Sequence, residues 1–181
     1  FKSAFIFNQT PNLNAEKYLS QEHYIYLAYF EPGIVKVGTA SKSRSKIRPI
    51  EQDALLYLFI ARSDGFKIQN LEKMISSTMN ITQKVSSQRK LRSLTLKPNP
   101  NAEHVLLDTY QKIKNNSDIQ NIFSEWFISE DEIRVVDLTK EADIIFPKEV
   151  YEVHDNNLFG EFVGLRGRFL ILKNKDDYLA F

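Results

Sequence analysis

The chain contains no cysteine among its 181 residues. Disulfide bonds and cysteine-ligated zinc are therefore excluded within these residues, and this composition agrees with a cytoplasmic location. The three histidines, His23, His104 and His154, lie far apart and lack the spacing of a zinc site. His23 precedes the first predicted strand and is expected to face solvent at the edge of a sheet.

Long hydrophobic runs are also missing. Nothing approaches the roughly 20 uninterrupted apolar residues that a membrane span requires, and no secretory pattern opens the chain. The formal net charge is only +1, so any surface for nucleic acid must come from local clusters of cations. The first residue is Phe1 rather than methionine, which suggests a trimmed N-terminus.

The segments that are present predict a small sheet with flanking helices. Residues 24–30 and 34–39 are rich in β-branched and aromatic side chains, and the pair Pro32-Gly33 between them marks a turn. The continuous apolar run at 54–61 is typical of a buried central strand. We therefore predict three strands in this part of the chain.

A helix is predicted over 66–79, where Leu71, Met74, Ile75 and Met79 recur at helical spacing. Glu72 borders or lies inside this apolar stripe. A carboxylate that faces inward is costly unless it is paired, hydrogen-bonded or bound to a metal. Two interpretations remain open: Glu72 reaches solvent or a cation at the edge of the stripe, or it belongs to a functional site.

Two stretches carry most of the clustered positive charge. Residues 41–48 contain four cations and no acid, and the stretch at 83–97 adds five more among serines and threonines. Such clusters are plausible contacts for phosphate groups, although many are only solvated. The candidate nucleic-acid-binding residues from these stretches and their neighbourhood are Lys42, Arg44, Lys46, Gln52, Arg89 and Arg92.

Lys36 is a second candidate, because alternation places it on the same face of the sheet as Tyr26 if the first two strands pair. A solvated lysine on an exposed face is the alternative. The basic side chains of Arg166 and Arg168 also share a strand face, where they either extend a basic surface or are solvated.

The predicted secondary structure changes in the second half of the chain. Pro98 and Pro100 mark a boundary, helices are predicted over 102–114 and 118–127, and the chain is β-rich from Glu132. We predict an α+β protein with an N-terminal strand and linker, a core, and a C-terminal part of helices followed by strands. Their ranges are 1–21, 22–97 and 98–181.

The core motifs resemble the GIY-YIG nuclease superfamily. Tyr24-Ile25-Tyr26 resembles the first half of its signature, and Lys36-Val37-Gly38 resembles the second half with lysine in place of the usual tyrosine. Arg48 and Glu72 occupy the places of its helical arginine and its metal-binding glutamate. The resemblance implies a small core built on a short, mostly antiparallel, three-stranded sheet.

A closer resemblance is to an uncharacterised family, a domain of unknown function, with a Y-L-A, K-V-G and R-W-x-x-Q-G-A core. Here the pieces are 26–28, 36–39, RPIEQDA at 48–54 and the glycine-containing segment 160–170. Pro49 stands where that family has tryptophan, and Asp53 where it has glycine.

These resemblances imply a DNA-binding endonuclease, a hydrolase that cleaves phosphodiester bonds with magnesium or manganese. The implied catalytic residues are Tyr26, Lys36, Arg48 and Glu72. Glu72 would hold the Mg²⁺ (or Mn²⁺), Arg48 the phosphate, and Tyr26 the attacking water. The partner would be nucleic acid, DNA rather than RNA, with no membrane involved. Two alternatives remain open: a nucleic-acid-binding module without catalysis, and a protein-interaction domain.

Overall fold

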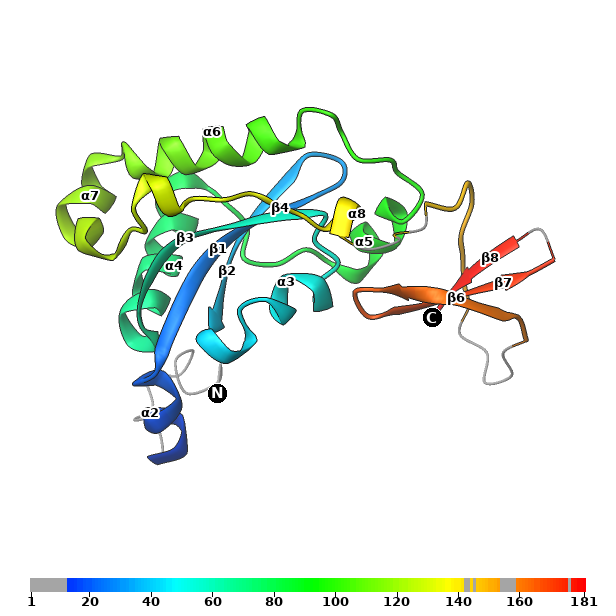
Figure 1. The fold of residues 1–181 in the computed structure, drawn as a ribbon, viewed down its shortest axis with the longest axis horizontal. Coiled ribbons are helices and arrows are strands. Elements are labelled where there is room, and N and C mark those ends of the chain that lie inside the picture. Colours follow the sequence, from blue (N-terminus) through cyan, green and yellow to red (C-terminus); the bar gives the residue numbers. More distant parts are fainter. Residues whose placement is uncertain (1–12, 142–143, 145, 154–158, 176) are drawn as a thin grey trace.

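A computed structural model describes residues 13–141, 144, 146–153, 159–175 and 177–181. Within them the chain is α+β, as predicted, with two separate four-stranded sheets and helices packed around the first (Figure 1). No helix in these ranges has the length and apolar character needed to cross a membrane.

The first sheet has the strand order β2-β1-β3-β4, and its paired strands are antiparallel. Its strands are β1 (Glu22–Phe30), β2 (Ile34–Ser41), β3 (Leu56–Asp64) and β4 (Val136–Asp137). The predicted turn at Pro32-Gly33 joins β1 to β2, and the predicted apolar run forms β3. All three strands predicted for this part of the chain form, and β4, from the second half of the chain, adds a fourth strand to the sheet by pairing with β3.

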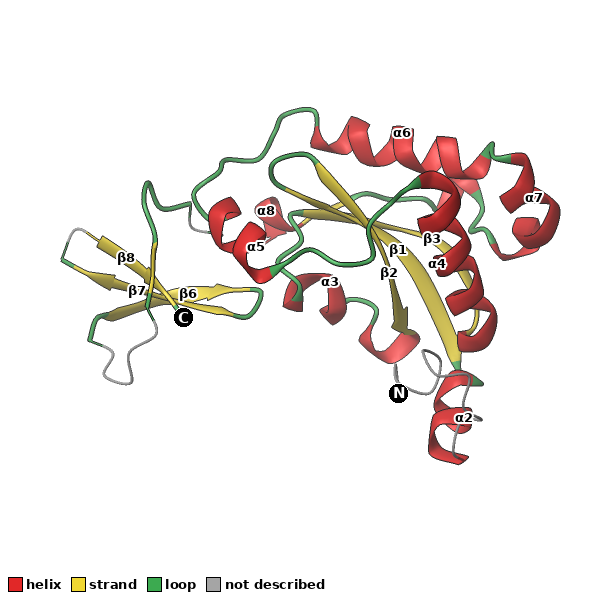
Figure 2. Cartoon of the chain, turned by 180° about the vertical axis from the view of Figure 1, so that it is seen from behind, coloured by secondary structure: helices red, strands yellow, loops and turns green. Residues whose placement is uncertain are grey.

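One face of this sheet is covered by helices α4 (Gly65–Met79), α6 (Ala102–Lys114) and α7 (Ser117–Phe123) (Figure 2). Alternation along β1 sends Ile25, Leu27 and Tyr29 into this layer, where all three are fully buried. From α4, Ile68, Leu71 and Ile75 meet them. The predicted apolar stripe is therefore the face of α4 that packs on the sheet.

Among the described residues, short elements cover the opposite face, and its core is smaller. Tyr26, Ala28 and Phe30 from β1 lie there with Tyr57 of β3 and Leu138. The 3₁₀ turn Lys42–Arg44, helix α3 (Ile47–Glu51) and helix α8 (Leu138–Glu141) lie near this face. Helix α3 is only five residues long, and Pro49 is its buried residue.

The second sheet has the order β5-β8-β7-β6 and lies beside helix α5 (Ser87–Ser93) (Figures 1 and 2). Its strands are β5 (Tyr151–Glu152), β6 (Glu161–Arg166), β7 (Phe169–Asn174) and β8 (Asp177–Ala180). Leu94, just after α5, packs into the core of this sheet with Phe169 and Ile171. Helix α2 (Leu13–Leu19) precedes β1, and two short 3₁₀ helices, Ser124–Trp126 and Glu130–Glu132, follow α7.

Candidate functional site

The phenol of Tyr26 lies at the centre of the candidate site. Tyr26 is fully buried on β1, and Gly38 faces it on β2. A Cβ added at Gly38 would stand 2.6 Å from the Tyr26 Cζ and 2.7 Å from its hydroxyl oxygen. The absence of a side chain at Gly38 therefore makes room for the phenol to extend across β2.

No described residue gives the Tyr26 hydroxyl a hydrogen bond, although the atom is buried. A buried hydroxyl without a partner is costly, and such groups in native proteins often mark a functional role. Burial raises the pKa of Tyr26 well above its usual value of 10. The phenol is therefore neutral near pH 7 and acts as a hydrogen-bond donor.

Charged side chains from two helices act on this phenol. After burial, the largest effect on the pKa of Tyr26 comes from Arg48, whose positive charge lowers it, followed by Glu72 and Glu51, whose negative charges raise it. Arg48 lies on α3, and Glu72 is half-buried on α4. The charges of Arg48 and Glu72, two of the predicted site residues, thus act on the phenol of a third.

Lys36 also lies on the side of Tyr26, as alternation along β2 predicts. Its Nζ is 5.8 Å from the centroid of the Tyr26 ring and donates a hydrogen bond to the side-chain oxygen of Gln52. Only 6% of Lys36 is exposed. Lys36 is thus a positioned cation rather than a solvated one, and Gln52 is the residue that holds it.

The two arginines of the first basic stretch are joined by a glutamate that follows them. Arg44 Nη2 lies 2.6 Å from Glu51 Oε1, and Arg48 Nη1 lies 3.2 Å from Glu51 Oε2. About half of the Arg44 side chain and a third of the Arg48 side chain remain exposed. Glu51 orients both guanidinium groups and leaves further N–H donors on each for a ligand.

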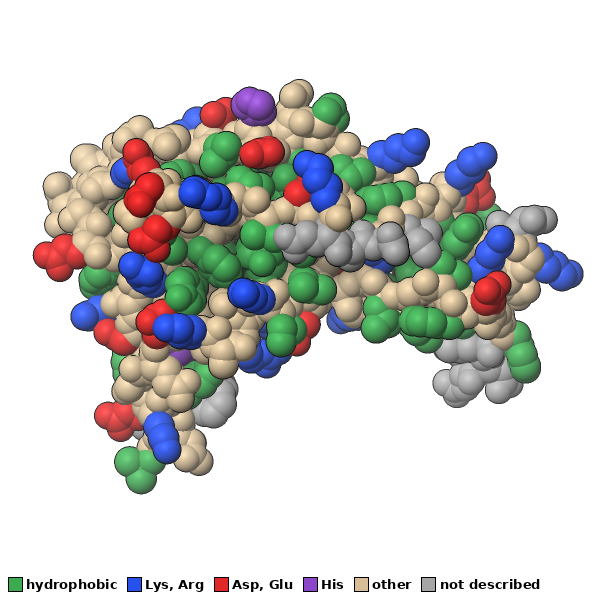
Figure 3. Space-filling view, viewed as in Figure 1, with side chains coloured by type: hydrophobic (Ala, Val, Ile, Leu, Met, Phe, Trp, Pro, Cys, Tyr) green, Lys and Arg blue, Asp and Glu red, His purple; other side chains and the backbone are tan. Residues whose placement is uncertain are grey.

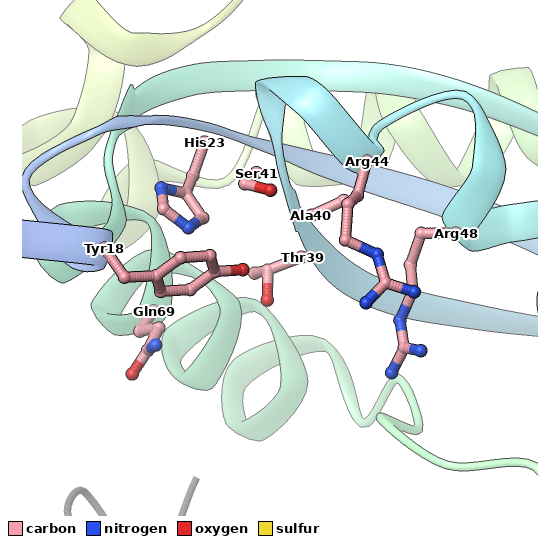
Figure 4. Close-up of a pocket in the computed structure, with 8 residues that line it drawn as sticks. All are labelled: Tyr18, His23, Thr39, Ala40, Ser41, Arg44, Arg48 and Gln69. Atoms are coloured by element: carbon pink, nitrogen blue, oxygen red, sulfur yellow. The ribbon is translucent and has the colours of Figure 1, made fainter. Parts of the chain in front are cut away.

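A cavity of about 200 Å³ opens beside these arginines (Figure 4). Arg44 and Arg48 extend side by side at one end, and the ring of His23 lies next to Tyr18 at the other. No carboxylate is among the described residues that line it. The lining consists of Tyr18, His23, Thr39, Ala40, Ser41, Arg44, Arg48 and Gln69.

The expectation that His23 faces solvent is wrong, because only 4% of it is exposed. Tyr18 of α2 packs edge-on against the ring at 4.9 Å between centroids. The backbone at Gly65 also closes over it, since a Cβ there would stand 2.9 Å from the imidazole. His23 Nδ1 lies 2.9 Å from the Gln21 carbonyl oxygen, while Nε2 is buried with no hydrogen-bond partner among the described residues.

The described residues suit a metal held by one or two carboxylates, not a site made entirely of protein ligands. Among the described residues no group of three or more His, Cys, Asp or Glu side chains forms a metal site. Glu72 and Glu51 are carboxylates whose charges act on Tyr26, and Glu51 is paired with Arg44 and Arg48. This donor set suits a hard cation such as Mg²⁺, which keeps several waters and binds through one or two carboxylates together with substrate phosphates.

The other predicted nucleic-acid contacts lie outside the cavity. Lys42 is exposed and pairs with Glu22 at 3.3 Å, and Lys46 is exposed. Arg89 and Arg92, on α5, line a different cavity beside Pro32 of the β1–β2 turn. In the space-filling view the lower outline is hollowed between α2 and the C-terminal sheet, with basic side chains around α3 (Figure 3).

Arg166 neither extends a basic surface nor is solvated, so both sequence interpretations are wrong for this residue. Its Nε donates to Asp53 Oδ1 at 2.8 Å, and both side chains are at most 4% exposed. Burial raises the pKa of Asp53, and the neighbouring Arg166 opposes this increase. The pair joins the turn after α3 to the end of β6.

Sequence reasoning missed several residues of the cavity, although some left a signal. Glu51 stands three residues after Arg48, the spacing of a helical ion pair. Gln69 stands three residues before Glu72, so the two are neighbours on α4. Thr39 and Ser41 continue the strand beyond Gly38 and alternate onto one face.

The fold and the site define an α+β protein with a buried phenol beside a cavity lined by cations and hydroxyl groups. Residues 8–179 match the family described as "Protein of unknown function (DUF2797)". The match spans nearly the whole chain, and the chain belongs to this family. No curated protein and no solved structure gives a significant match.

This result corrects the assignment suggested by the YIY and KVG motifs. The family match is to DUF2797 and not to the GIY-YIG nucleases. It supports only the expectation of a family of unknown function.

Proposed function

We propose that the chain hydrolyses phosphodiester bonds of nucleic acid with the help of one divalent cation. Four side chains form the proposed reaction centre: Tyr26, Lys36, Arg48 and Glu72. The observation that carries the proposal is the Tyr26 hydroxyl, which is buried without a described partner while the charges of Arg48 and Glu72 both act on it. A ligand oxygen that reached this buried hydroxyl would remove the cost of leaving it without a partner.

Tyr26 serves as a hydrogen-bond donor in this proposal. Its raised pKa keeps the proton on the phenol at neutral pH, so it does not act as a phenolate base. It can donate to the attacking water or to a non-bridging phosphate oxygen. A positioned donor that meets developing negative charge is typically worth about 10²–10³ in rate.

The two cations of the site have separate tasks. Arg48 keeps N–H donors beyond the one that meets Glu51, and its planar guanidinium suits two oxygens of one phosphate. Lys36 is held by Gln52 near the Tyr26 ring. There it adds a compact positive charge that opposes the charge of the phosphate.

Glu72 would hold the divalent cation, Mg²⁺ or Mn²⁺. When bound, such a cation stabilises negative charge on the scissile phosphate and on the leaving oxygen.

We also propose a cytoplasmic location, which the absence of cysteine favours, and DNA as the first substrate to test.

A nucleic-acid-binding module without catalysis is the second candidate. The observation in its favour is that the carboxylates whose charges raise the pKa of Tyr26 are Glu72 and Glu51, and Glu51 is already paired with Arg44 and Arg48. Phosphate binding needs only the positively charged side chains, whereas hydrolysis also requires Glu72 to hold the divalent cation.

The test is an incubation of the protein with labelled single- and double-stranded DNA and RNA in Mg²⁺, Mn²⁺ or EDTA. We expect cleavage with the metals, none with EDTA, and none with Glu72→Gln. Glu103→Gln, an exposed glutamate on α6, is the matched control and should cleave normally. Salt-sensitive binding without cleavage would support the module instead.

A further inference from the structure

We infer that the cavity between Arg44 and His23 binds a terminal phosphate group, a phosphomonoester at the end of a nucleic-acid strand. The inference rests on the proposed function for its choice of nucleic acid. The cavity itself is independent of the reaction centre except for Arg48, which borders both.

The charges of the lining fit an anion with two negative charges. Two guanidinium groups point along one end of the cavity, hydroxyl groups of Thr39 and Ser41 line its side, and no carboxylate is among the described lining residues. Glu51 pairs with both arginines, and the group of two guanidinium cations and one carboxylate keeps a net positive charge. A phosphomonoester carries about −1.5 to −2 near pH 7, whereas a diester within a strand carries −1, so the end group gains more from this lining.

His23 supplies the second, independent observation. It is almost fully buried, lines the cavity, and leaves Nε2 without a hydrogen-bond partner in the described part of the chain. Since Nδ1 meets the Gln21 carbonyl oxygen at 2.9 Å, Nδ1 carries a proton. Nε2 is then an acceptor in the neutral ring and a donor in the charged ring. A phosphate satisfies both forms, through a P–OH group or through a charged oxygen.

The size of the cavity favours an end group over a whole nucleotide. Its volume of about 200 Å³ is below the roughly 300–1,000 Å³ of pockets that enclose drug-sized ligands. A phosphate group with a few waters fits, and the attached sugar and base would lie outside. A phosphorylated strand end satisfies this geometry because its remaining nucleotides continue over the surface.

The position of the cavity gives the bound end a role. Thr39 lines the cavity and directly follows Gly38, which lies against the Tyr26 phenol. A phosphate held by Arg44 and His23 would therefore fix the distance from the strand end to the bond near Tyr26. The chain would then select strand ends that carry a phosphate.

The test uses Glu72→Gln protein, so that binding is measured without cleavage. The probes are oligonucleotides of one sequence with a 5′-phosphate, a 3′-phosphate or hydroxyl ends, and binding is followed by fluorescence anisotropy. We expect the oligonucleotide with one kind of phosphorylated end to bind about tenfold more tightly than the oligonucleotide with hydroxyl ends. A charge-assisted hydrogen bond to the ionised end group provides free energy of this order. Equal affinity for all three would overturn the inference.

Two variants in the same background separate the cavity from general charge attraction. Arg44→Gln and Lys46→Gln each remove one positive charge, but only Arg44 lines the cavity. Arg44→Gln should abolish the preference for the phosphorylated end, whereas Lys46→Gln should weaken binding to all probes alike. Thr39→Val, a change of one hydroxyl, should reduce the preference without disturbing the fold. Equal effects of Arg44→Gln and Lys46→Gln would contradict the inference.

A nucleoside monophosphate is used as competitor to identify the source of the phosphate. If the mononucleotide displaces the oligonucleotide only at concentrations far above that of the oligonucleotide, the result supports the strand end as the ligand. If the mononucleotide binds more tightly than the oligonucleotide, the pocket is assigned to a free nucleotide and the strand-end inference is overturned. Because no probe is cleaved, a preference for phosphorylated ends would stand even if hydrolysis were never observed. Cleavage without any end preference would leave the proposed function and reject only this pocket.

Discussion

The Tyr26 phenol and Gly38 are in direct contact across β1 and β2, and any side chain at Gly38 would occupy the space of the phenol. The distances from an added Cβ are 2.6 Å to Cζ and 2.7 Å to the hydroxyl oxygen. The position of the candidate reaction centre thus depends on a residue that has no side chain.

Gly38→Ala is expected to displace the Tyr26 ring and to lower the free energy of unfolding by about 1–3 kcal/mol, the usual cost of overpacking. Gly164→Ala is the matched control, since a Cβ at Gly164 meets no atom within 4 Å. Urea denaturation measures both. A loss at Gly164→Ala as large as that at Gly38→Ala would show that the close contact is not the cause.

Tyr26→Phe is expected to keep or raise stability, by up to about 1 kcal/mol, because it removes a buried hydroxyl that lacks a described partner. Tyr24→Phe, on the same strand, provides the comparison. It removes a hydroxyl that donates to Glu22 at 2.6 Å and should not stabilise the protein. Thermal or urea denaturation of the two variants distinguishes a functional hydroxyl from a structural one.

The raised pKa of Tyr26 predicts a loss of stability at alkaline pH. The folded state holds this proton to a higher pH than the unfolded state, whose tyrosine titrates near 10. The resulting contribution is complete below pH 10 and is lost as the pH rises above it. The free energy of unfolding, measured by urea from pH 8 to 11, should fall more steeply in the wild type than in Tyr26→Phe. Parallel curves would mean that Tyr26 titrates normally.

The pair of Asp53 and Arg166 is expected to anchor the C-terminal sheet. Asp53→Asn removes the charge of the carboxylate that meets Arg166 Nε at 2.8 Å, and the loss of one partner of a buried ion pair typically costs about 3–5 kcal/mol. Arg62→Gln is a suitable control, because the Arg62–Glu132 pair is about half exposed and such pairs are worth about 1 kcal/mol or less. Similar losses in both variants would argue against an anchoring role for the buried pair.

Local patterns in the sequence predicted the local structure well. Strands β1, β2 and β3, the turn at Pro32-Gly33 and the apolar stripe of α4 all follow from residues close together in the chain. The α+β class was correct for the same reason. Alternation also placed Lys36 on the side of Tyr26, because a strand has a fixed side-chain period.

Contacts between distant segments were not predictable in this way. Asp53 and Arg166 are 113 positions apart, and neither carries a local signal of the other. The burial of His23 depends on Tyr18 of α2 and on the backbone at Gly65. The strand pairing of β4 with β3 likewise joins segments about 80 residues apart, which periodicity does not reveal.

The most direct test of the account is the single-turnover rate of phosphodiester cleavage in Mg²⁺ for the wild type, Tyr26→Phe, Glu72→Gln and the double variant. If the two residues act at one reaction centre, each single substitution should slow cleavage by at least about 100-fold, and the double variant should be about as slow as the slower single variant. Absence of cleavage by the wild type, or an unchanged rate in Glu72→Gln, would contradict the account.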